Sequence, residues 1–184
     1  KEEEKKNWEF FLELPNVDRN KVKRTVRGVQ VLEPLFEFSG ACAGCGETPY
    51  LKMISQLFGD RILAANATGC SSIYGGNLPT TPWSQNSEGK GPAWSNSLFE
   101  DNAEFGYGYR LTTDQHVAMA HRLISELKGE LDATLVDDIL AAPQSKESDI
   151  RKQRYRVAQL REKLEKLGSH KAKELLSIVD HFVR

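Results

Sequence analysis

Hydrophobic and polar positions at the start of the chain alternate with a helical period. Residues 1–14 begin with a charged run and then place aromatic and aliphatic side chains on one helical face, which predicts a short helix. Pro15 ends this pattern, because proline cannot continue a helix. From Thr25 to Phe38, β-branched and aromatic residues interrupted by Pro34 predict an extended segment without a continuous strand ladder.

A different pattern follows the small residues between Ser39 and Gly46. Apolar residues then recur at helical spacing, which predicts a helix that begins near Pro49 and ends before Gly59. The short apolar run at 61–66 is typical of a buried parallel strand, and a second turn of small residues, 67–72, follows it directly. This order of elements indicates an α/β domain with its chemistry at the strand ends.

Residues 75–96 lack periodicity and are rich in Gly, Pro, Asn and Ser. A loop of this length inside a compact domain is uncommon, and it favours a functional or interfacial segment. The alternative is an exposed, flexible loop. Trp83 and Trp94 argue against that alternative, because both indole rings need to be buried.

The last part of the chain is helical by its periodicity. Amphipathic stretches occur at 117–127, 135–140 and about 145–167, and a further helix is expected from His170. In the third stretch Ile150, Val157 and Leu164 recur every seven residues, but over too few heptads for a partner-binding coiled coil. Packing within the chain is therefore the favoured interpretation of this stripe.

The whole pattern predicts an α/β fold in which helices flank a parallel sheet, with a largely helical C-terminal section. We divide the chain into an N-terminal helix and linker, residues 1–32, an α/β segment, residues 33–110, and the helical section, residues 111–184.

Composition narrows the possible functions. The 184 residues are 39% hydrophobic and 28% charged, as in ordinary globular proteins, and the net charge of −1 argues against nucleic-acid binding. No apolar run reaches the roughly 20 residues that span a bilayer, and the start of the chain has no apolar core of a secretory signal. We therefore expect a cytoplasmic protein that binds neither nucleic acid nor membrane.

The chain contains three cysteines, Cys42, Cys45 and Cys70, an odd number that cannot pair completely within one chain. All three lie in turns of small residues, where exposed backbone N–H groups could hydrogen-bond thiolates and cluster sulfides. Zinc would need a fourth ligand, but the four histidines all lie in the helical tail without metal-ligand spacing. An iron–sulfur cluster is thus favoured, while zinc and a redox-active thiol pair remain open.

Two segments resemble the cluster-binding region of single-chain pyruvate:ferredoxin (flavodoxin) oxidoreductases. They are residues 35–50, LFEFSGACAGCGETPY, and residues 65–82, ANATGCSSIYGGNLPTTP. Residues 91–94 and 96–106 continue the resemblance, which is strongest between residues 33 and 110 and covers nearly the whole chain.

The resemblance implies specific roles. Cys42, Cys45 and Cys70 would bind the 4Fe–4S cluster next to thiamine diphosphate, and Glu47 and Cys70 would contact that cofactor within a thiamine-diphosphate-binding fold. The intact enzyme would oxidatively decarboxylate pyruvate or another 2-oxoacid, transfer the acyl group to coenzyme A and reduce ferredoxin or flavodoxin. It would work as a homodimer together with the remaining domains of the parent enzyme.

Several family features have no counterpart here. A 4Fe–4S cluster takes four ligands, but this chain has three cysteines. The family's Gly-Asp-Gly segment, which holds Mg²⁺ and the diphosphate, also has no match, since Gly59-Asp60-Arg61 does not replace it. We therefore expect the fourth cysteine and the Mg²⁺ ligands to lie outside this chain, and we assign it no catalytic residue. The fragment alone is expected to be inactive. Glu47 could instead be a carboxylate that stabilises a helix start, and the chain could be a zinc-stabilised binding module or a metal-free helical interaction segment.

Overall fold

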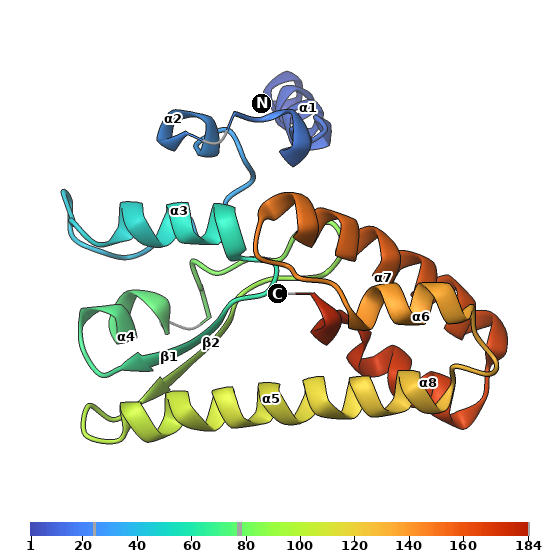
Figure 1. The fold of residues 1–184 in the computed structure, drawn as a ribbon. Helices are drawn as coiled ribbons and strands as arrows, with labels where there is room; N and C mark the ends of the chain where they lie inside the picture. Colours follow the sequence, from blue (N-terminus) through green and yellow to red (C-terminus); the bar gives the residue numbers. More distant parts are fainter. Residues whose placement is uncertain (24, 77–78, 184) are drawn as a thin grey trace. The chain divides into compact units, whose positions relative to one another are not determined.

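The computed structural model describes residues 1–23, 25–76 and 79–183, with the side chains of Asn20 and Glu147 excluded. The chain forms two compact units, Lys1–Gly106 and Tyr107–Arg184. Helix α5, Asn102–Glu126, contains the boundary between them (Figure 1).

The N-terminal part of the first unit consists of α1, Glu2–Glu13, the 3-10 turn η1, Arg19–Lys21, and α2, Val26–Val29. The helix predicted over residues 1–14 is thereby confirmed. The prediction of an extended segment from Thr25 is wrong at its start, because the Thr25 side chain accepts a hydrogen bond from the Gly28 N–H at 3.1 Å and begins α2.

The central part of the first unit contains a small parallel sheet. Strand β1, Leu63–Ala67, pairs with β2, Ala93–Ser97, in the register Asn66↔Asn96 (Figure 1). Within the described residues the sheet has these two strands, so the fold there is mostly helical with a small sheet rather than a broad helix-flanked sheet. The parallel strand predicted at 61–66 is confirmed apart from its ends, but it is not buried as expected, since Leu63 is exposed and the other residues of β1 are only partly buried. Strand β2 extends into the region interpreted as a loop.

Two helices flank strand β1 in sequence. Helix α3, Thr48–Phe58, has proline in its first turn and is followed by Gly59, as its sequence predicts. Helix α4, Cys70–Gly75, begins after β1, where a turn was expected.

Buried polar side chains connect α3 to the preceding linker. Ser55 Oγ accepts a hydrogen bond from Leu35 N–H at 3.0 Å, and Gln56 Nε2 donates to the Leu32 carbonyl at 2.7 Å. Arg19 adds two bonds to main-chain oxygens near the end of α3, at 2.6 and 2.8 Å. These bonds fix the segment that leads into the first cysteine turn.

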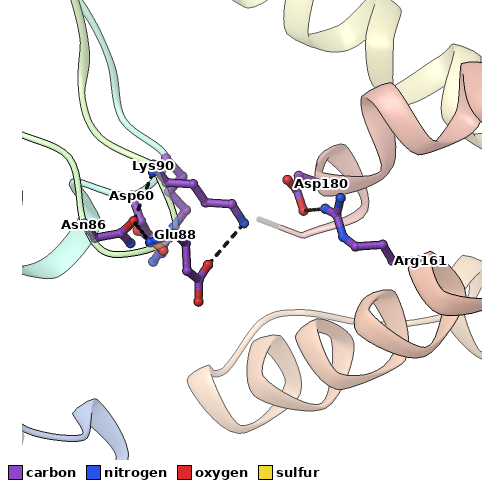
Figure 2. A network of polar contacts seen from close by, with 7 residues as sticks. Asp60, Asn86, Glu88, Lys90, Arg161 and Asp180 are labelled. Atoms are coloured by element: carbon purple, nitrogen blue, oxygen red, sulfur yellow. Dashed lines mark hydrogen bonds and ion pairs between the residues drawn. The ribbon is translucent and has the colours of Figure 1, made fainter. Parts of the chain in front are cut away.

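Residues 84–91 are ordered by their own polar contacts. Asn86 Oδ1 accepts hydrogen bonds from the N–H groups of Glu88 and Lys90, both at 3.0 Å. Lys90 Nζ also lies 3.7 Å from the Glu88 carboxylate (Figure 2). The two tryptophans predicted to be buried lie partly in the interior: Trp83 packs on Phe36 with ring centres 4.7 Å apart, and Trp94 belongs to β2.

The second unit is a helical assembly. It contains most of α5, followed by α6, Ala133–Leu140, α7, Glu147–Leu167, α8, His170–Ile178, and the 3-10 turn η2, Val179–Phe182. Its apolar core is continuous across these elements. The fully or almost fully buried members include Ile124, Val136, Val157, Leu160, Leu164, Leu175 and Phe182.

Packing within the chain accounts for the heptad stripe of α7. Val157, Leu160 and Leu164 are all less than 5% exposed in the core of the second unit. Gly168, with φ of 62°, ends this helix in the left-handed conformation. The C-terminal turn is held by Arg161, whose guanidinium lies 2.8 Å from Asp180 (Figure 2). No helix among the described residues is both long and apolar enough to cross a membrane.

Candidate functional site

The first cysteine turn is a tight loop that leads into α3. The Cys45 N–H donates to the Cys42 carbonyl at 3.0 Å, and Gly44 between them has φ of 75°. That conformation favours glycine, because a side chain would be strained there. A Cβ added at Gly44 or Gly46 would meet no atom within 4 Å, so the space beside the turn is open.

Cys45 lies in a setting that stabilises its thiolate. The pKa of its thiol is lowered chiefly by hydrogen bonds from the backbone N–H groups of Glu47 and Thr48, with a smaller contribution from the Thr48 side chain. Burial and the negative charge of Glu47 oppose this effect. Amide donors at a helix start favour the anionic form of sulfur, which is the form that binds metals.

The second cysteine turn lies at the carboxyl end of β1, where Cys70 is the first residue of α4. Its neighbour Gly69 donates its N–H to Ser72 Oγ at 3.0 Å, and Ser72 Oγ donates to Asn96 Oδ1 at 2.8 Å. Asn66 Nδ2 also donates to Asn96 Oδ1, at 3.0 Å. We call Asn66, Ser72 and Asn96 the strand-end network; it joins the ends of both strands to the Cys70 turn.

Tyr74 shows that residues from both turns lie near one another. Its side chain is 3% exposed, and it follows Cys70 by about one helical turn. The pKa of Tyr74 is raised strongly, first by burial and then by Glu47, with smaller effects of Cys45 and Cys70. Glu47, Cys45 and Cys70 thus all act on the same phenol, and Glu47 lines one cavity with it.

Cys42 is exposed and does not belong to the group around Tyr74. All three cysteines are free thiols. Among the described residues, no three or more His, Cys, Asp or Glu side chains are grouped closely enough to hold a single metal ion. Glu47 stands at the N-cap of α3, but its side chain makes no capping hydrogen bond.

A cavity of about 130 Å³ adjoins this group. Glu47, Tyr74, Trp83 and Trp94 line it together with aliphatic residues of α3 and β1. Two polar atoms buried there, Tyr74 Oη and Trp83 Nε1, have no hydrogen-bond partner within the described parts of the chain. Buried polar atoms are usually paired, so these two mark a place where a partner is missing.

The sequence alone identified Cys42, Cys45, Cys70 and Glu47 as candidates but missed Tyr74, Trp83 and the strand-end network. A tyrosine four residues after Cys70 resembles an ordinary core residue in the sequence. Only the α4 geometry, which turns its side chain toward Glu47, distinguishes it.

Comparison with known proteins identifies relatives along the whole chain. A pyruvate-flavodoxin oxidoreductase of Nostoc sp. is 56% identical over 191 residues, covering 100% of this chain and 16% of the relative. One from Rhodospirillum rubrum is 55% identical and matches 97% of this chain and 15% of the relative. The pyruvate:ferredoxin oxidoreductase of Moorella thermoacetica is 52% identical over 142 residues, 77% of this chain and 11% of the relative.

No family model matches the chain. The chain spans only about 15% of the length of the curated relatives that it matches from end to end. Identity above 50% over such a span is far beyond a local motif match. The chain is therefore homologous, over its full length, to one segment of the pyruvate-flavodoxin oxidoreductases.

Proposed function

We propose that this chain is the part of a pyruvate:flavodoxin or pyruvate:ferredoxin oxidoreductase that supplies Cys42, Cys45 and Cys70 to a 4Fe–4S cluster beside thiamine diphosphate. The observation that carries the proposal is that Tyr74 lines one cavity with Glu47 and that Glu47, Cys45 and Cys70 all raise its pKa. A thiolate pair and a carboxylate from separate turns would thus share one environment, as a cluster next to an organic cofactor requires.

The chemistry of the donor set fits a cluster. Cysteine thiolates are the usual ligands of 4Fe–4S clusters, and the amides of Glu47 and Thr48 already favour the thiolate of Cys45. Open space beside Gly44, Gly46 and Gly69 leaves room for a bulky inorganic group. A 4Fe–4S cluster binds its ligands at separate corners of a cube, so they need not converge as they do around one ion. The fourth ligand would come from another part of the parent enzyme.

The position of the site also fits an organic cofactor. In α/β folds, ligands bind beyond the carboxyl ends of parallel strands, where the Cys70 turn and the strand-end network lie. In this proposal Glu47 and the Cys70 turn contact thiamine diphosphate. When bound, that cofactor supplies an electron sink for decarboxylation, and the cluster accepts single electrons.

In this proposal the chain forms one part of a larger parent enzyme. Residues 33–110 would belong to a thiamine-diphosphate-binding fold, preceded by the linker 1–32 and followed by the helical section 111–184. Pyruvate-contacting residues, Mg²⁺ ligands and the coenzyme A site would come from the remaining domains of a homodimeric enzyme. Flavodoxin or ferredoxin would take the electrons, as the names of the relatives indicate for those proteins.

The test is the iron and acid-labile sulfide content of the full-length parent enzyme, purified anaerobically, with each cysteine changed singly to serine. Cys42→Ser, Cys45→Ser and Cys70→Ser should each lose up to about four iron atoms per chain. Ser87→Ala, at an exposed position outside both cysteine turns, is the control for losses during purification. Unchanged iron and sulfide in all three variants would reject the cluster assignment, and stoichiometric zinc in its place would support a structural zinc module.

A further inference from the structure

We propose that Tyr74 is a positioning residue whose hydroxyl donates a hydrogen bond to the Glu47 carboxylate and fixes that carboxylate between the two cysteine turns. The inference rests on the proposed function in one respect, namely that Glu47 faces the cofactor. It gives a role in the site to Tyr74, a residue of α4 that lines the cavity.

The Tyr74 side chain is the fixed member of this pair. It is 3% exposed, and its ring packs edge-on against Phe36 with ring centres 6.0 Å apart. Glu47, by contrast, is exposed at the N-cap of α3 and makes no capping hydrogen bond. A rigid buried donor beside a movable exposed carboxylate is the arrangement that orients the carboxylate.

Tyr74 and Glu47 line the same cavity, and Glu47 raises the pKa of the Tyr74 hydroxyl both as a hydrogen-bonding group and as a charge. Yet the hydroxyl makes no hydrogen bond of good geometry with any described residue. Because the Glu47 side chain is exposed, it is free to rotate toward the hydroxyl and complete the bond. Leaving a buried hydroxyl unpaired is costly, so the completed bond is favoured.

Among the described residues that line the cavity, Tyr74 carries the one buried hydroxyl without a hydrogen-bond partner. Glu47 forms no ion pair with the described residues, and no lysine or arginine side chain contributes to the group around Tyr74. A phenol suits the task because it donates a hydrogen bond without adding a charge beside the thiolates. Phenylalanine at this position would fill the same space and remove the donor alone.

The decisive experiment measures the affinity of the full-length apoenzyme for thiamine diphosphate, with Mg²⁺ present, by equilibrium titration. Tyr74→Phe should weaken binding roughly 3- to 30-fold, as expected for the loss of a hydrogen bond to a charged group that acts indirectly. The melting temperature of the apoenzyme should stay unchanged or rise, because an unpaired buried hydroxyl has been removed. Tyr50→Phe, a 65%-exposed tyrosine of α3, is the matched control and should bind normally.

A double variant separates positioning from ordinary packing. If Tyr74 acts through Glu47, adding Tyr74→Phe to Glu47→Gln should change the affinity less than about twofold. Equal effects of Tyr74→Phe in both backgrounds would overturn the inference, because the tyrosine would then act independently. Unchanged affinity in Tyr74→Phe with weakened binding in Glu47→Gln would overturn it as well and leave the proposed function intact. Normal binding by both single variants would instead reject the contact between Glu47 and the cofactor.

Discussion

The two units of this chain differ in how much of their apolar side-chain surface they bury. The second unit buries most of the apolar core, which extends from Ala120 on α5 to Phe182 in η2. The first unit leaves large apolar groups exposed, such as Phe38 at 98% and Phe99 at 77%, while Tyr74 and Trp83 carry unpaired polar atoms inside it. The second unit therefore packs most of its large apolar side chains, whereas the first leaves many of them exposed.

The largest effect is expected in the second unit. Leu160→Ala should lower the free energy of unfolding by about 2–5 kcal/mol, because Leu160 is completely buried in α7 and its loss leaves a cavity. Chemical denaturation of this chain measures the effect. Tyr155→Ala, at a 67%-exposed position of the same helix, should change the stability by less than about 0.5 kcal/mol. If Leu160→Ala lowered the free energy of unfolding as little as Tyr155→Ala, packing in the core of the second unit would not be its main source of stability.

The next effect concerns binding rather than stability. In the full-length enzyme, Glu47→Gln should weaken thiamine diphosphate binding about ten- to a hundredfold, since a hydrogen bond to a carboxylate is worth roughly 1.5–3 kcal/mol. The cluster should remain assembled. A purely helix-stabilising carboxylate would give the opposite result, normal affinity with a stability loss of at most about 1 kcal/mol. Measuring affinity and melting temperature on one sample separates the two outcomes.

A smaller effect is expected from the strand-end network. Asn96→Ala removes the acceptor shared by Asn66 and Ser72, and should cost about 1 kcal/mol of stability. Ser72 also accepts a hydrogen bond from the N–H of Gly69, the residue before Cys70. The same change should therefore loosen the Cys70 turn and reduce the iron content of the parent enzyme. Ser95→Ala, the neighbouring position in β2, is the control. Normal iron content in Asn96→Ala would show that the Cys70 turn is held by other contacts.

The smallest effect is a difference in thiol reactivity. The backbone amides of Glu47 and Thr48 lower the pKa of Cys45, so its thiolate persists to lower pH than that of an ordinary cysteine. In the metal-free chain, alkylation of Cys45 should therefore reach half its maximal rate at a lower pH than in the unfolded chain. Unfolding in urea should remove this advantage. Mass spectrometry of alkylated peptides measures each cysteine separately, and a midpoint at or above that of the unfolded chain would contradict the amide contacts.

The sequence was most informative where local signals decide the structure. Helix α3 was predicted from the proline in its first turn and from Gly59 after its last turn. Helices α6 and α7 were predicted from their apolar periodicity. Strand β2, with the sequence Ala-Trp-Ser-Asn-Ser, was missed because its strand character comes from pairing with β1 rather than from its own composition. The beginning of α5 was missed as well, since Gly106 and Gly108 interrupt its apolar pattern.

The same division holds for the candidate site. Cys42, Cys45, Cys70 and Glu47 lie in motifs that can be recognised from residue order alone. The importance of Tyr74 depends on burial and on a neighbour 27 positions away in the chain, and neither is visible in local sequence. Residues that bind a group directly are thus more predictable here than residues that orient them.

The register of β1 and β2 has a consequence for how the site assembles. The Cys42–Cys45 turn closes over a few residues, whereas the Cys70 turn is anchored through Asn66 and Asn96, which are 30 positions apart. Closing the longer segment costs roughly 2 kcal/mol more chain entropy. The local turn can therefore form while the strands are still separate. The Cys70 turn becomes ordered only when the strands pair, so the last step of assembling the site is also the step that completes the sheet.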